Sequence, residues 1–84
     1  MKEVLAKDTI VGDSYMLDLS PYGVFKLQIV RISNTEDNKG NNVCLGVQVK
    51  DERIPNNISM ISGGTILKEM NDEYYNNAKK LRKQ

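Results

Sequence analysis

The sequence contains no histidine and only one cysteine, Cys44, among its 84 residues. Histidine is the commonest general base and a frequent metal ligand, and a structural zinc site needs about four cysteine or histidine ligands. A lone cysteine cannot form a disulfide within the chain, and no basic group directly flanks Cys44 to activate its thiol. We therefore expect a structural cysteine, no metal, no cofactor and no enzymatic activity.

Long apolar runs are also absent. The longest stretch without a charge, residues 54–67, is interrupted by proline, asparagine and glycine, whereas a membrane-spanning helix needs about 18 or more apolar residues. Near the N-terminus the apolar run is limited to residues 4–6, and a signal peptide needs a run of about 7–15. These absences, together with the lone cysteine, predict a soluble cytoplasmic protein.

The remaining composition is that of a small folded domain. Hydrophobic residues make up 39% and charged residues 27% of the chain, which excludes an unfolded tail, and 84 residues hold one core, so we expect a single domain over residues 1–84. The net charge of +1 gives no general attraction to polyanions. Abundant asparagine and an excess of lysine over arginine are typical of AT-rich genomes, such as those of phages and low-GC bacteria.

Alternating apolar residues predict several strands. In the second of them the apolar parity slips near Ile29 and Val30, and a β-bulge there would restore it. Turn-forming residues at 20–23 predict a chain reversal before this strand. The expected strands cover residues 14–19, 24–33, 43–50 and 58–61, and their apolar faces predict a core of Leu17, Phe25, Leu27, Leu45 and Val47.

The end of the chain reads as a helix over residues 72–83. Asn71 is a good N-cap, acidic residues follow it, and basic residues fill the last turn, so both ends complement the helix dipole. Tyr74, Ala78 and Leu81 recur at helical spacing and are expected to dock on the sheet. Residues 65–70 are compatible with either a strand or a helix.

Together these elements predict a mostly β fold with a C-terminal α-helix. We expect a small, bent antiparallel sheet or a partly open barrel of four or five strands. This arrangement resembles SH3-like or OB-like barrels in the length of its strands and the spacing of its loops. The resemblance is architectural and rests on no family motif, and a fold of this kind does not identify a function.

Without catalytic equipment, the expected function is that of a small interaction or regulatory protein, encoded by a phage or mobile element, that binds a larger protein partner. The polar segment 34–42 is long for a hairpin loop, and long loops are often functional. Tyrosine and arginine are enriched among interface hot spots, and Tyr75 is expected to face outward beside Lys79. The predicted partner-binding residues are Glu36, Asp37, Lys39, Tyr75, Lys79 and Arg82.

The alternative is a nucleic-acid-binding module that uses the basic C-terminal helix and a barrel face. Aromatic side chains near cations are needed for that role, and only Tyr22 near Lys26 and Tyr75 near Lys79 qualify. If the interface lies away from the helix and the polar loop, the next candidate is the face around Tyr22, Lys26 and Gln48. The sequence leaves open whether the chain forms homo-oligomers.

Overall fold

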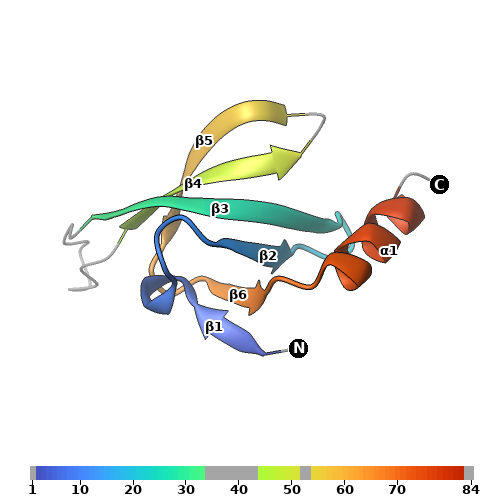
Figure 1. Cartoon of the computed structure of the whole chain (residues 1–84), viewed down its shortest axis with the longest axis horizontal. Helices are drawn as coiled ribbons and strands as arrows, with labels where there is room; N and C mark the ends of the chain where they lie inside the picture. Colours follow the sequence, from blue (N-terminus) through green and yellow to red (C-terminus); the bar gives the residue numbers. More distant parts are fainter. Residues whose placement is uncertain (1, 34–43, 52–53, 83–84) are drawn as a thin grey trace.

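The computed structural model of the chain describes residues 2–33, 44–51 and 54–82. It shows one antiparallel sheet with strand order β1-β6-β2-β3-β4-β5 and a helix at the C-terminal end (Figure 1). The elements are β1 (Glu3–Leu5), a 3-10 turn η1 (Ala6–Asp8), β2 (Ser14–Asp18), β3 (Val24–Ser33), β4 (Cys44–Asp51), β5 (Ile54–Ser62), β6 (Ile66–Glu69) and α1 (Asp72–Arg82).

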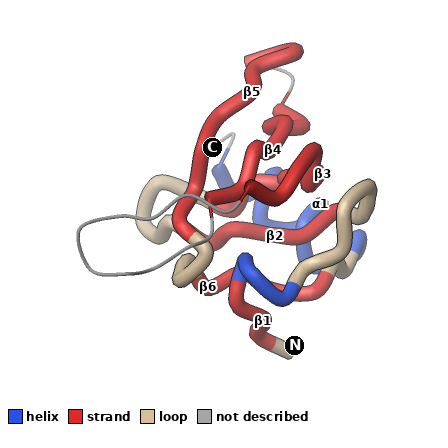
Figure 2. Tube along the Cα trace, turned by 90° about the vertical axis from the view of Figure 1, so that its left-hand side faces the viewer, coloured by secondary structure: helices blue, strands red, loops and turns tan. Residues whose placement is uncertain are grey.

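The predicted class is confirmed, but the sheet is open and has six strands rather than four or five. The chain runs as a meander from β2 to β5, and β1 and β6 then extend the sheet beyond β2, as Figure 2 shows from the side. Residues 65–70, which were compatible with strand or helix, contain β6. The structure shows the first of the two expected forms, an open antiparallel sheet, in which β1 and β5 lie at opposite edges.

The expected β-bulge in β3 is confirmed. The pairing of β3 with β4 shifts register between Ile29 and Arg31, so Val30 is the extra residue, and it is 42% exposed. The shift places Arg31 opposite Gly46, where a Cβ on the glycine would meet the Arg31 Cγ at 3.0 Å. The bulge therefore keeps the arginine off the apolar face and calls for a glycine beneath it.

The sheet has an inner face and an outer face. The inner face carries the main core, in which residues from β2, β3, β4 and β6 pack with η1. The predicted core residues Leu27, Leu45 and Val47 are fully buried there, whereas Leu17 and Phe25 are only partly buried at its margin. The buried members of the main core are Ala6, Tyr15, Leu27, Ile29, Leu45, Val47 and Leu67.

The helix packs on the outer face. Tyr75 is 8% exposed and forms a second cluster with Met16 and Val24, and its hydroxyl donates to the Lys50 carbonyl at 3.4 Å. The predicted N-cap is confirmed, because the Asn71 side-chain oxygen accepts a hydrogen bond of 2.8 Å from the Tyr74 N–H. Within the described residues, no helix has the length and apolar character needed to cross a membrane.

The expected outward orientation of Tyr75 is therefore wrong. Tyr75 takes the place predicted for Tyr74 in the docking stripe, since Tyr75 is buried and Tyr74 is 36% exposed. The predicted Ala78 does pack against this cluster, and the side chain of Leu81 lies outside the described part. The short connection from Glu69 at the end of β6 to Asp72 at the start of α1 fixes which side of the helix meets the sheet. Helical periodicity alone cannot show which of two adjacent aromatic residues, Tyr74 or Tyr75, faces the sheet.

Candidate functional site

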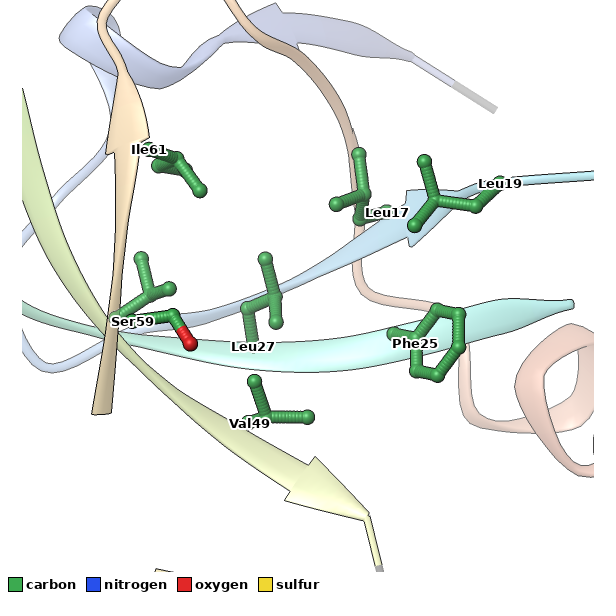
Figure 3. Close-up of a pocket in the computed structure, with 8 residues that line it drawn as sticks. Leu17, Leu19, Phe25, Leu27, Val49, Ser59 and Ile61 are labelled. Carbon is green, nitrogen blue, oxygen red and sulfur yellow. The ribbon is translucent and has the colours of Figure 1, made fainter. Parts of the chain in front are cut away.

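The inner face of the sheet contains a pocket of about 230 Å³ next to the main core. Its lining comes from the four consecutive strands β2 to β5 and from Leu19, which follows β2, and the side chains converge within the bend of the sheet (Figure 3). Every lining residue is apolar except Ser59. The lining consists of Leu17, Leu19, Phe25, Leu27, Val47, Val49, Ser59 and Ile61.

Strand alternation places these residues on one face. Leu17 pairs with Phe25, Leu27 with Val49, and further along the sheet Val47 pairs with Ser59. Residues directly opposite each other in an antiparallel pair project to the same side. The sequence thus determines a continuous apolar row across β2 to β5, and the curvature of the sheet turns that row into a hollow.

The pocket is buried at one end and open at the other. Leu27 and Val47 are 3% and 1% exposed, whereas Leu19 at the mouth is 45% exposed. Tyr22, in the same β2–β3 turn as Leu19, is 78% exposed. Apolar surface therefore continues from the interior of the pocket to the outside of the molecule.

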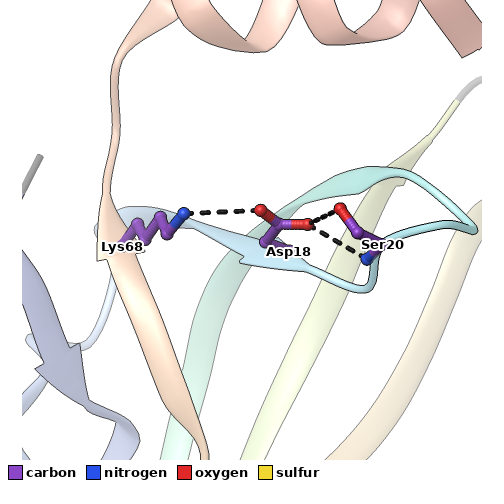
Figure 4. Close-up of polar contacts among 3 residues, drawn as sticks. All are labelled: Asp18, Ser20 and Lys68. Carbon is purple, nitrogen blue, oxygen red and sulfur yellow. Dashed lines mark hydrogen bonds and ion pairs between the residues drawn. The ribbon is translucent and has the colours of Figure 1, made fainter.

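Polar contacts around Asp18 fix the turn at the mouth (Figure 4). The Asp18 carboxylate accepts hydrogen bonds from the Ser20 hydroxyl and from the Ser20 N–H, the latter at 3.0 Å. Its other oxygen lies 3.4 Å from the Lys68 ammonium of β6. These contacts, led by the bond from the Ser20 hydroxyl, hold the pKa of Asp18 below its usual value of 3.8.

The same lysine links the turn to the helix. The Lys68 ammonium lies 5.8 Å from the centre of the Tyr74 ring, within the range of a cation–π interaction. The turn beside the pocket, strand β6 and the first turn of α1 are thus connected through one partly buried cation. This arrangement positions the turn that carries Leu19 and Tyr22 relative to the sheet.

A second hollow of about 470 Å³ lies near the start of β2 and the end of β6. Its lining mixes apolar residues with two carboxylates, those of Asp13 and Glu69, and both residues are exposed to solvent. Exposed carboxylates are ordinary surface residues, so the uniformly apolar pocket is the better candidate. No group of His, Cys, Asp or Glu within the described parts of the chain is arranged to hold a metal ion.

Of the sequence-predicted site residues, Tyr75 alone has a side chain within the described part of the structure. Tyr75 is buried between α1 and the sheet. The backbone of Lys79 and Arg82 belongs to α1, but their side chains lie outside the described part. Glu36, Asp37 and Lys39 also lie outside the described residues. The next candidate is the face around Tyr22, Lys26 and Gln48. Gln48 of β4 pairs with Gln28 of β3, and Lys26 lies two residues before Gln28 on β3, so Lys26 and Gln48 share the outer face.

Sequence reasoning missed the pocket because it assigned Leu17 and Phe25 to a filled core. The signal that could have shown it is Ser59, a small polar residue at an inward position of β5, opposite the apolar Val47 of β4. Comparisons of this chain with protein-family models, with curated proteins and with solved structures give no match.

Proposed function

We propose that this chain is a non-enzymatic binding protein that holds an apolar side chain of a larger protein partner in the pocket of the inner face. The observation that supports this proposal is the lining, in which Ser59 is the only polar residue and the mouth is exposed at Leu19. Exposed concave apolar surface costs free energy in a soluble protein, and it is typical of interaction sites. The free thiol of Cys44 is compatible with a cytosolic setting, which is part of the proposal.

The size of the pocket favours a side chain over a small-molecule ligand. Sites for drug-sized ligands measure about 300–1,000 Å³ and contain a few polar groups that orient the ligand. This pocket measures about 230 Å³ and offers only the Ser59 hydroxyl. A single large apolar side chain needs no orienting group, because the backbone that carries it is held by the surrounding surface.

The β2–β3 turn extends this surface beyond the pocket. Tyr22 is 78% exposed, and tyrosine is enriched at the centres of protein interfaces. A partner whose side chain enters beside Leu19 would also meet the turn that carries Tyr22. The nucleic-acid alternative has less support, because burial of Tyr75 removes one of the two aromatic residues it requires.

The first experiment tests the pocket with toluene as a probe of apolar side chains. We expect millimolar toluene to shift the methyl resonances of Leu17, Leu27 and Ile61 in an NMR titration. The Leu19→Lys variant places a charged chain at the mouth and should weaken the titration at least about fivefold. Val11→Lys is the matched control, since Val11 is 53% exposed and lies outside the lining. Shifts spread over the outer face, or an equal effect of both variants, would contradict the proposal.

A second experiment identifies the partner chemistry. Selection from a displayed random-peptide library should enrich peptides with a large apolar residue, and their binding should be lost in Leu19→Lys but kept in Val11→Lys. Binding to an apolar pocket should change little with salt, whereas phosphate binding weakens steeply. Selection of nucleic acid in a nuclease-controlled pull-down, with strong salt dependence, would favour the alternative function instead.

A further inference from the structure

Strand β5 forms one edge of the described sheet. It pairs with β4 along its length, and the strand order places no other described strand on its outer side. Free strand edges can pair with another strand, so proteins usually protect them with charge, proline or a bulge. Here η1 contacts the region where β5 ends, and the Lys7 N–H donates to the Gly63 carbonyl at 3.0 Å.

Among the residues that the structure describes, protection is confined to the two ends of β5. Pro55 lies near its start, and the register with β4 shifts between Val49 and Asp51. Residues 57–62 between these features contain neither a charged residue nor a proline. This part of the edge is therefore not protected by the usual devices.

The exposed side chains in the middle of this segment are apolar, whereas those at its two ends, Asn57 and Ser62, are polar. Ile58 is 64% exposed and Met60 is 54% exposed, and because they are two residues apart they project from the same, outer face. Met60 is paired with Gly46, which offers no side chain to cover it. Ser59 between them projects to the inner face and the pocket.

We propose that two copies of this chain pair antiparallel through β5, around a two-fold axis at Ser59. In this register Ile58 of each copy lies opposite Met60 of the other, so apolar side chains cover each other on the outer face. Identical strands are a suitable match because residues 57–62 carry no charge that would repel its own copy, and a two-fold interface must be self-complementary. The result is one sheet continuous across both copies.

The contact area indicates how strong this dimer should be. A stable interface buries about 800 Å² on each partner, which is a large share of the 5698 Å² surface of the chain. The free edge of residues 57–62 with two exposed apolar side chains is smaller than that. We therefore expect reversible association in the micromolar range rather than a permanent dimer.

The test is sedimentation equilibrium of the full chain at about 1–500 µM. The weight-average mass should rise from 9.5 kDa toward twice that value, with little dependence on salt. Ile58→Lys should weaken association at least about tenfold. Ile10→Lys is the matched control, because Ile10 is 63% exposed and lies in the connection between η1 and β2, and it should leave association unchanged.

The register has its own test. Ile58→Lys mixed with Met60→Glu places opposite charges across the proposed pair, so the mixture should associate more tightly than either variant alone. A monomer at every concentration, equal effects of Ile58→Lys and Ile10→Lys, or no gain in the mixture would overturn the proposal. Leu19→Lys should leave the self-association unchanged, so failure of the dimer and failure of the pocket can be distinguished.

Discussion

Replacing Ser59 by valine should stabilise the protein by partly filling the pocket. Ser59 is half-buried in the lining, and its strand position suits a β-branched residue. Valine replaces the hydroxyl by two methyl groups, and each buried carbon contributes about 0.8 kcal/mol. Because the pocket is open to solvent, we expect about half of the full effect, which is a gain of about 0.5–1 kcal/mol.

The lost hydroxyl has a small opposing effect. The Ser59 oxygen accepts a hydrogen bond of 3.1 Å from the Asn57 side chain, and this bond is exposed. Exposed hydrogen bonds contribute little, because water replaces the missing partner. Ser59→Ala removes the same bond without filling the pocket, so it is the control that separates the two effects.

Thermal and urea unfolding measure the outcome. For a domain of this size, a gain of about 0.5–1 kcal/mol should raise the Tm by about 2–8 °C, and the same variant should weaken toluene binding. If Ser59→Val is less stable than Ser59→Ala, the space beside Ser59 is already filled by other side chains, and the pocket has no room there for a bound side chain. Unchanged toluene binding would show that the probe occupies another site.

Four further changes test the packing and electrostatics. Leu45→Ala removes a side chain that is 0% exposed and should lower the free energy of unfolding by about 2–5 kcal/mol; a loss below about 0.5 kcal/mol in a urea melt would contradict its place in the core. Tyr75→Ala should cost about 3 kcal/mol and reduce the helical circular dichroism signal, whereas an unchanged signal would mean that the residue does not anchor α1. Asn71→Ala should cost about 1 kcal/mol in chemical unfolding, and Asn71→Gly only a few tenths; equal losses would argue against the cap. Because the pKa of Asp18 is lowered in the fold from 3.8, its contribution should be complete above that pH and disappear as the pH falls through the folded-state pKa; the difference in unfolding free energy between wild type and Asp18→Asn should shrink in acid, and a difference that does not change with pH would exclude the charge as its source.

The parts of the fold that the sequence predicts well are those with strong local signals. Strand β3 has the predicted limits, its bulge is where the parity slips, and α1 begins after the predicted Asn71 cap. In each case the signal lies within a few residues. Local chemistry is sufficient there because neighbouring backbone groups and side chains determine the conformation.

The parts that the sequence leaves open or does not predict depend on distant contacts. β1 and β6 are short, too short for periodicity to identify, and each is stabilised by pairing with the other. The first residues of β5 contain Pro55 and asparagines, which suggest a loop, yet an edge strand tolerates proline on its free side. The side of α1 that meets the sheet depends on where β6 ends beside β2, and the shape of the pocket follows from how the sheet bends, so both depend on segments that are distant in sequence.

The pairing of β1 with β6 has a consequence for the order of folding during synthesis. Residues 3–5 pair with residues 66–68, so during synthesis β1 cannot form this pairing until β6 has left the ribosome. The meander from β2 to β5 contains only neighbouring strands and can form earlier, because nearby segments meet at a lower cost in chain entropy. Leu67, on β6, is fully buried, so the main core remains incomplete until this last step. Pulsed hydrogen exchange during refolding should therefore protect the amides of β3 and β4 before those of β1, and simultaneous protection would show that the sheet forms in a single step.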